Sequence, residues 1–120
     1  MRIANYAVLL FAVLPLVAHG NITCITENYE VTIIEHCGEN ETFCRNVSYI
    51  GKSKKTGKSI KLKGSQTIRT CADGVTPCQM MGWEFFSGPY RYAITDARSL
   101  WVSRDGRDVL VEKCLQYEDR

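Results

Sequence analysis

Hydrophobic and polar residues alternate with a period of two along most of the chain after residue 20, which is the pattern of half-buried β-strands. β-branched residues dominate the segment 29–37, YEVTIIEHC. Apolar residues alternate with lysines in 59–71, SIKLKGSQTIRTC, and two aromatic-rich segments follow, WEFF at 83–86 and YRYAIT at 90–95. Each of these segments is predicted to form a strand.

A further pair of strands is predicted in SLWVSRDGRDVLVEKC, residues 99–114. Its two apolar arms meet at Asp105-Gly106, and Asp-Gly is a strong hairpin signal because both residues tolerate the positive φ of a type I′ turn. No stretch has convincing helical spacing, although 22–37 or the C-terminal tail has room for a short helical turn. The pattern therefore predicts an all-β domain, a small disulfide-stapled sandwich or barrel of six to seven short antiparallel strands.

The first 20 residues, MRIANYAVLLFAVLPLVAHG, have a different pattern. Arg2 precedes an apolar run at 7–17 and small residues follow it, which is typical of a secretory signal peptide with cleavage before Asn21. The run is shorter than the roughly 20 residues of a membrane-spanning helix, so we expect no membrane insertion. Residues 1–20 are interpreted as a signal peptide and 21–120 as a single secreted, extracellular domain; the alternative is an uncleaved membrane anchor.

All six cysteines follow the predicted signal peptide, and an even number of cysteines in an exported chain indicates three disulfides. These cysteines are Cys24, Cys37, Cys44, Cys71, Cys78 and Cys114. One pairing joins Cys24 to Cys114 across the domain and closes the two short spacings, 37–44 and 71–78, locally. Joining the ends constrains the unfolded chain most, by about 4 to 5 kcal/mol on the loop-entropy argument.

The spacing of the first three cysteines, CITENYEVTIIEHCGENETFC, is similar to that of three-finger proteins. This resemblance implies an interlaced pairing instead, which joins Cys24 to Cys44, Cys37 to Cys71 and Cys78 to Cys114. The C-terminal CLQYEDR lacks the paired cysteines of that family, and the segments 44–71 and 78–114 are long for fingers. Both pairings remain open from the sequence.

Three N-glycosylation sequons lie close together, at Asn21, Asn40 and Asn46. In a eukaryotic secretory route we expect one or two of them to carry sugar. A glycosylated segment faces solvent, so residues 21–48 are expected at the surface, and the rest of the domain is freer to bind a partner.

Charge is unevenly distributed along the chain. Residues 21–44 contain five glutamates and no Lys or Arg, whereas residues 45–69 contain eight Lys or Arg and no acidic residue. A block of one sign creates a local field, so lysines here are candidate contacts for a host or extracellular protein or a polyanionic surface. They are Lys52, Lys54, Lys55 and Lys58. The alternative is a solvated hairpin tip that contacts nothing.

The same segment has the composition of a phosphate-binding loop but the wrong spacing. Five residues, KSKKT, separate Gly51 from Gly57, where that loop needs four. The residues that follow alternate like a strand and do not begin a helix, so no nucleotide is expected. No metal or other cofactor is expected either, because the chain after residue 20 has no CxxC and a single histidine, His36.

Aromatic residues concentrate in GWEFFSGPYRY, residues 82–92. Trp83 and Phe85 are expected in the core, because a domain of this size needs large aromatic side chains there. Tyr90, Arg91 and Tyr92 follow a Gly-Pro turn and belong to the residue types that interfaces favour. We therefore predict partner contacts at these three residues.

A catalytic site has little support in the sequence. No GxSxG nucleophile motif is present. Glu84, Arg91 and His36 would supply the carboxylate, arginine and histidine of a small secreted ribonuclease, but nothing in their spacing requires it. We therefore predict that the protein is not an enzyme and has no catalytic residues.

The signal-like N-terminus MRIANYAVLLFAVLPLVAHG, the small size and the six cysteines resemble those of small secreted cysteine-rich proteins of the effector or toxin type, as plant-associated fungi deploy. The resemblance implies a stable β-rich scaffold that binds a host or extracellular target and acts in virulence. We expect it to be a monomer. The alternatives are a three-finger-like extracellular receptor ligand or inhibitor and a secreted ribonuclease-like enzyme.

Overall fold

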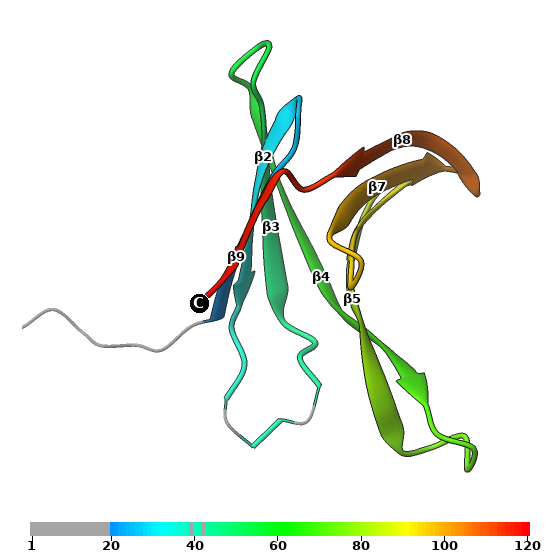
Figure 1. The fold of residues 1–120 in the computed structure, drawn as a ribbon. Helices are drawn as coiled ribbons and strands as arrows, with labels where there is room; N and C mark the ends of the chain where they lie inside the picture. The colour runs from blue at the N-terminus through cyan, green and yellow to red at the C-terminus, as the bar shows by residue number, and fades with distance from the viewer. Residues whose placement is uncertain (1–19, 39, 42) are drawn as a thin grey trace, which may run out of the picture.

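The computed structural model describes residues 20–38, 40–41 and 43–120 (Figure 1). The predicted signal peptide, apart from Gly20, lies outside the described residues. The described part of the chain contains no helix, and so none that crosses a bilayer.

Nine strands form one antiparallel sheet, so the all-β prediction is confirmed. The strands are β1 (Gly20–Ile25), β2 (Tyr29–Glu35), β3 (Val47–Ser53), β4 (Ser59–Thr70), β5 (Pro77–Ser87), β6 (Tyr90–Thr95), β7 (Ser99–Arg104), β8 (Arg107–Lys113) and β9 (Gln116–Asp119).

The prediction of six to seven strands was too low because it missed β1, β3 and β9. β1 and β9 are short strands near the ends of the domain, and they pair with each other, with Cys24 opposite Tyr117. Pairing between segments this far apart in the sequence does not affect the alternation of hydrophobic and polar residues within either strand. In β3, VSYIGKS, small residues at Gly51 and Ser53 weaken the apolar alternation, although their face is the inner one.

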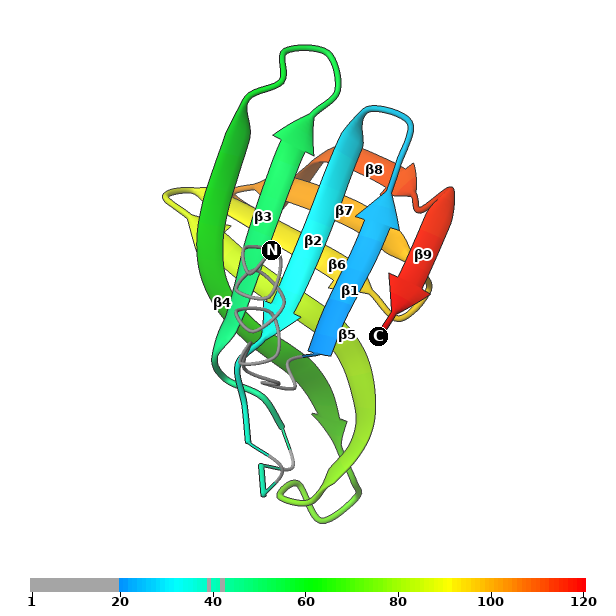
Figure 2. The ribbon, with the colours of Figure 1, turned by 90° about the vertical axis from the view of Figure 1, so that its left-hand side faces the viewer.

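The sheet is a meander whose last strand returns to its beginning. Its order is β8-β7-β6-β5-β4-β3-β2-β1-β9, so each strand lies beside its sequence neighbour except for β9, which follows β8 in the chain but pairs with β1. The sheet curls into a half-barrel, and Figure 2 shows β1 to β4 crossing in front of β5 to β8. The predicted sandwich or barrel is therefore a single curled sheet.

Two glycines permit the close approach of strands in the curl. Gly82 has φ of 126°, and a Cβ there would collide with the carbonyl of Ile94 on β6. The β4–β5 pairing shifts register beside Gly82, between Thr67 and Ile68. A Cβ on Gly64 would likewise collide with the carbonyl of Glu84. Bulges and glycines of this kind increase strand twist and bending, which curls the sheet.

The core lies on the inner, concave face of the sheet. Residues opposite one another in antiparallel strands share a face, and the register places Tyr49 opposite Leu62 and Phe85 opposite Tyr92. Trp83 and Phe85 are buried there, as predicted. The other large, fully buried apolar side chains are Tyr49, Ile22, Ile33, Ile94, Leu100, Val31 and Val47.

Of the two cysteine pairings left open by the sequence, the structure has the one with a long bridge and two short bridges. Cys24 bonds to Cys114 at a Cα–Cα distance of 5.2 Å, and the two other bonds are Cys37–Cys44 and Cys71–Cys78. The interlaced pairing implied by the three-finger resemblance is wrong. The meander brings the end of β8 to β1, while each short bridge closes a single loop between neighbouring strands.

The predicted Asp-Gly hairpin is confirmed. Asp105 and Gly106 connect β7 to β8, with φ values of 51° and 82°. Both are positive, as a type I′ turn requires.

Candidate functional site

A cavity of about 390 Å³ lies on the concave face, between the inner sides of β2 to β4 and of β6 to β8. Figure 2 shows these two groups of strands crossing. The lining residues are Tyr29, Tyr49, Gly51, Ser53, Lys58, Ile60, Tyr92, Leu100, Val102, Val109 and Leu110. An apolar wall with a few polar groups is the composition of small-molecule sites.

Three tyrosines on different strands line this cavity. Tyr49 on β3 packs with its ring centroid 5.4 Å from that of Tyr92 on β6 and 5.1 Å from that of Phe85 on β5. Tyr29 on β2 is close enough to both tyrosines to affect their ionisation. Alternation in β3 puts Tyr49 and Gly51 on the same face, and the ring lies over the space that a Gly51 side chain would occupy.

Burial favours the protonated form of two of these tyrosines, Tyr49 and Tyr92. Burial, together with the nearby Tyr92 and Tyr29, raises the pKa of Tyr49 far above its ordinary value. Burial also raises the pKa of Tyr92, with smaller contributions from Tyr90 and Tyr29. Their hydroxyls are therefore neutral at physiological pH, and each has a proton to donate.

Lys58 is the charged residue among the cavity-lining side chains that the structure describes. It follows Gly57, whose φ of 75° completes the β3–β4 turn, and its carbonyl accepts a hydrogen bond from Ser53 N at 2.9 Å. The turn therefore fixes the Lys58 backbone beside the end of β3. Lys58 is thus the one charged residue in the described lining of the cavity.

Lys54, in the same turn, has a structural role. Its Nζ donates to the Thr26 carbonyl at 2.6 Å, and its backbone N donates to the Asn28 carbonyl at 2.9 Å. Asn28 in turn donates to Glu112 on β8 through both its backbone N and Nδ2. These bonds join the β3–β4 hairpin, the β1–β2 turn and the edge strand β8 beside the cavity.

A polar cluster occupies the opposite end of β2 from Tyr29. Glu35 Oε2 accepts hydrogen bonds from Trp83 Nε1 at 2.8 Å and from Gln66 Nε2 at 2.7 Å. The side-chain Oε1 of Gln66 accepts a hydrogen bond from Cys44 N at 2.8 Å. Glu35 lies six positions along the strand from Tyr29, or about 20 Å, so this cluster lies away from the cavity.

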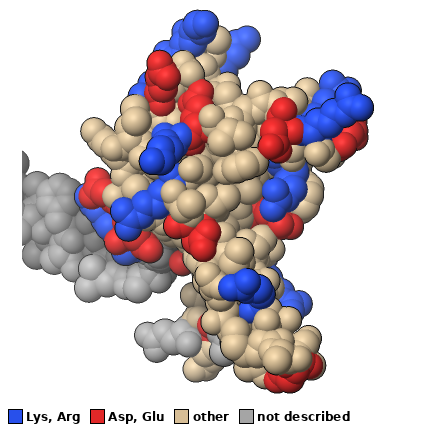
Figure 3. All heavy atoms as spheres, turned by 45° about the vertical axis from the view of Figure 1, so that its right-hand side comes forward, with Lys and Arg blue, Asp and Glu red and all other residues tan. Residues whose placement is uncertain are grey.

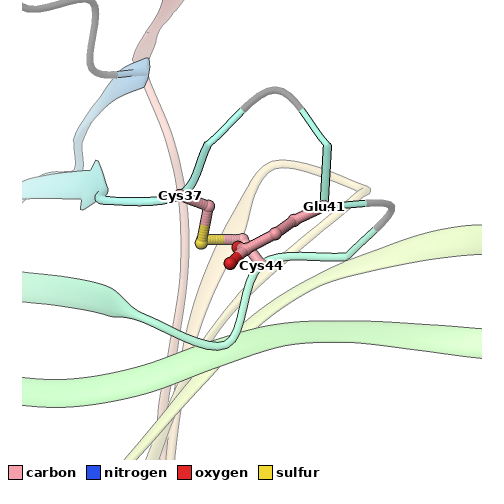
Figure 4. A group of neighbouring side chains, drawn as sticks. All are labelled: Cys37, Glu41 and Cys44. Atoms are coloured by element: carbon pink, nitrogen blue, oxygen red, sulfur yellow. A yellow bond between two sulfur atoms is a disulfide. The ribbon is translucent and has the colours of Figure 1, made fainter.

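Cys37, Glu41 and Cys44 are the group of potential metal ligands in the described residues (Figure 4). The figure shows the two sulfurs bonded to each other, with the Glu41 carboxylate beside them. A disulfide sulfur is not a thiolate, and the thiolate is the metal-binding form of cysteine. One carboxylate then remains, which falls short of the four ligands of a zinc site.

The residues of the ribonuclease hypothesis fall into two separate places. Arg91 Nη2 lies 3.2 Å from Glu84 Oε2, on neighbouring strands β6 and β5. His36 Nε2 lies 2.9 Å from Ser48 Oγ on β3. Strand β4 separates β3 from β5, a gap of about 10 Å across the sheet, so the three side chains do not form one set.

The predicted contact residues do not form one surface either. Tyr90 and Tyr92 are partly buried on the inner face, whereas Arg91 between them points outward to Glu84. Lys52 and Lys55 are exposed, and Lys52 lies opposite Glu30 in the β2–β3 register. Figure 3 shows Lys and Arg interspersed with Asp and Glu over this face, including its projecting parts.

The asparagines of the three sequons, Asn21, Asn40 and Asn46, are all exposed. Asn21 lies on β1, where its backbone exchanges hydrogen bonds with Arg120. Asn40 lies within the loop closed by Cys37–Cys44 and Asn46 follows that loop, while Thr42, the third residue of the Asn40 sequon, lies outside the described residues. Their side chains have room for a sugar.

The sequence interpretation missed most of the cavity. Tyr29 and Tyr49 were not singled out, and Tyr92 and Lys58 were predicted to contact a partner at the surface. One feature of the sequence could have indicated the cavity. In VSYIGKS, the alternate positions that face inward hold a large residue, Tyr49, followed by two small ones, Gly51 and Ser53. Small residues on the inner face of a curled sheet leave space beneath the side chains around them.

The comparisons with known proteins found no relatives. No protein-family model, no curated protein and no solved structure matches the chain. What the structure supports is thus a cysteine-rich, all-β half-barrel with three disulfides.

Proposed function

We propose that the protein is a non-enzymatic binding protein that holds a small molecule with an apolar body in the concave cavity of the half-barrel. The observation that carries this proposal is the cavity itself, walled by aliphatic side chains and supplied with three tyrosines and one lysine. Concave, mostly apolar sites with a few placed polar groups are where proteins bind small molecules.

Secretion forms part of the same proposal. Three disulfides in a small all-β chain are consistent with an extracellular protein. The signal-peptide pattern at 1–20 and the exposed sequons at Asn21, Asn40 and Asn46 support export through a secretory route. The protein would then act outside the cell that produces it.

An effector- or toxin-type role fits this activity when the target is a small molecule of a host or competitor. The protein would bind that molecule and lower its free concentration. The separation of Tyr92 from Arg91, on opposite faces of β6, gives less support to binding of a protein target through these residues.

The experiment is a fluorescence titration with N-phenylnaphthylamine, an uncharged apolar probe whose emission rises in a non-aqueous site. We expect saturable binding of one probe per chain. Val109→Trp, at the cavity rim, should weaken binding by about tenfold or more, because the indole occupies ligand space.

Val111→Trp is the matched control. Val111 lies on the same strand and is similarly exposed, 49% against 55% for Val109, but it faces Trp101 on the outer side of the sheet. This variant should bind the probe as the unmodified protein does. Absence of saturable binding, or equal weakening by the two substitutions, would overturn the proposal.

A further inference from the structure

The polar side chains in the described cavity wall are hydroxyl-bearing residues and one lysine. Tyrosines come from β2, β3 and β6, a serine comes from the end of β3, and Lys58 comes from the β3–β4 turn. The described lining includes no Asp, Glu, Asn or Gln. The wall therefore has hydrogen-bond donors and one positive charge, but no anion to receive a cationic ligand.

The hydroxyl of Tyr49 is a donor with no protein partner among the described residues. The residue is 2% exposed, and no hydrogen bond to its hydroxyl is formed. The hydroxyl lies 2.7 Å from the position that a Cβ on Gly51 would take, so it and its ring occupy the space that a larger residue at Gly51 would fill. A ligand acceptor that reached this hydroxyl would give it a hydrogen bond that the described protein groups do not supply.

The charge of Lys58 is not neutralised by the protein. The ion pairs of the described chain involve Arg91, Arg104 and Arg120. Glu112, the carboxylate on the inner side of nearby β8, accepts hydrogen bonds from Asn28 and interacts with Lys54. The Lys58 ammonium is thus available to a ligand at the rim.

Building on the proposed function, we infer that the ligand is an amphipathic monocarboxylate. Its carboxylate binds the Lys58 ammonium and the tyrosine hydroxyls, and its hydrocarbon body packs against Leu100, Val102 and Leu110. One ammonium matches a single negative charge, whereas phosphate groups are usually bound by several cations or by the guanidinium fork of arginine. Tyrosine rings also attract cations, but a ligand cation would meet the like charge of Lys58.

The test is a competition assay in which three ligands of equal chain length displace N-phenylnaphthylamine from the unmodified protein. They are dodecanoate, dodecanol and dodecylamine, each below its micellar concentration. We expect dodecanoate to bind about tenfold more tightly than dodecanol, since a charge-assisted hydrogen bond is worth about twice a neutral one. Dodecylamine should bind most weakly.

Three variants assign the preference to the cavity. Lys58→Met keeps the apolar stem but removes the charge, and it should reduce dodecanoate affinity about fivefold while leaving dodecanol affinity unchanged. Tyr49→Phe removes the buried hydroxyl and should also reduce dodecanoate affinity more than that of dodecanol. Lys55→Met, at an exposed position in the same turn, is the control and should change neither.

The outcomes separate this inference from the proposed function. If the probe binds but dodecanoate competes no better than dodecanol or dodecylamine, the inference is overturned and the cavity remains a binding site. Equal effects of Lys58→Met and Lys55→Met would also overturn it, because the charge would then act through the general field. If neither probe nor competitor binds, both proposals are wrong.

Discussion

Glu112 on β8 accepts two hydrogen bonds from Asn28, a residue 84 positions earlier in the chain. The backbone N of Asn28 lies 3.3 Å from Oε1, and its Nδ2 lies 2.7 Å from Oε2. β8 is an edge strand, so this contact ties an otherwise unpaired edge to the β1–β2 turn. The contact therefore holds β8 against the β1–β2 turn beside the cavity.

This contact predicts a pH dependence of stability. Partial burial opposes ionisation of Glu112, but hydrogen bonds from Thr26 and Asn28 and the charge of Lys54 outweigh it, so the pKa of Glu112 lies below its ordinary value. A lowered pKa in the folded state stabilises the protein above the unfolded-state pKa of about 4.3, and this contribution is lost as the pH falls through the folded-state pKa.

Glu112→Gln should therefore lower the free energy of unfolding at neutral pH by about 1 kcal/mol, a small value because the contact is partly exposed. The difference from the unmodified protein should shrink in acid. Thermal unfolding followed by circular dichroism across this pH range measures it, with Glu27→Gln, exposed in the same turn, as the control. A gap that stays constant with pH would contradict the assignment.

The long disulfide should contribute more stability than a short one. Cys24–Cys114 spans 90 residues, and Cys71–Cys78 spans 7. On the loop-entropy argument, replacing both cysteines of the long bridge by serine costs about 4 to 5 kcal/mol, whereas the short bridge costs about 2 kcal/mol. Urea unfolding of the two double variants tests this order, and an equal loss in both would exclude it.

Trp83 and Trp101 should respond differently to replacement by phenylalanine. Trp83 is 3% exposed and donates to Glu35, so Trp83→Phe leaves a partly buried carboxylate with one donor fewer and should cost about 1 to 3 kcal/mol. Trp101 is 36% exposed on the outer face, and Trp101→Phe should change stability by about 0.5 kcal/mol or less. Chemical denaturation measures both, and a neutral Trp83→Phe would show that the indole hydrogen bond adds no stability.

The exposed lysines of the β3–β4 hairpin predict salt-sensitive retention on a polyanion. Replacing Lys52 and Lys55 together by alanine should reduce retention on a heparin column at low salt, and the difference should fade as salt screens the charges. Arg107→Ala with Lys113→Ala removes the same charge from exposed positions on β8 and is the control. Identical elution of the two double variants would mean that net charge, and not this hairpin, governs retention.

Most strands could be predicted from the sequence because their signal is local. The alternation in 59–71 and the β-branched run in 29–37 mark β4 and β2 with no knowledge of their neighbours. Asp105-Gly106 marks the β7–β8 hairpin for the same reason, since two adjacent residues determine the turn. The register shift at Gly82 was not predictable, because it depends on the approach of the Ile94 carbonyl from another strand.

The candidate site was predicted only in fragments. Lys58 and Tyr92 were among the predicted contact residues, but they were not predicted to lie together in one cavity. Strand alternation shows that Tyr92 and Arg91 lie on opposite faces, yet it does not say which face is concave. Tyr29 and Tyr49 join Tyr92 only when the sheet curls, so the cavity has no local signature.

The sequence by itself determined the strand-rich class and the even set of cysteines, because periodicity and cysteine number are properties of short segments and of composition. Only the tertiary structure decided that Cys24 bonds to Cys114, that β9 returns to β1, and that Tyr49 and Lys58 line one cavity. These relationships join residues far apart in the chain. They exist because the sheet curls and brings its ends together, which depends on packing across the whole domain.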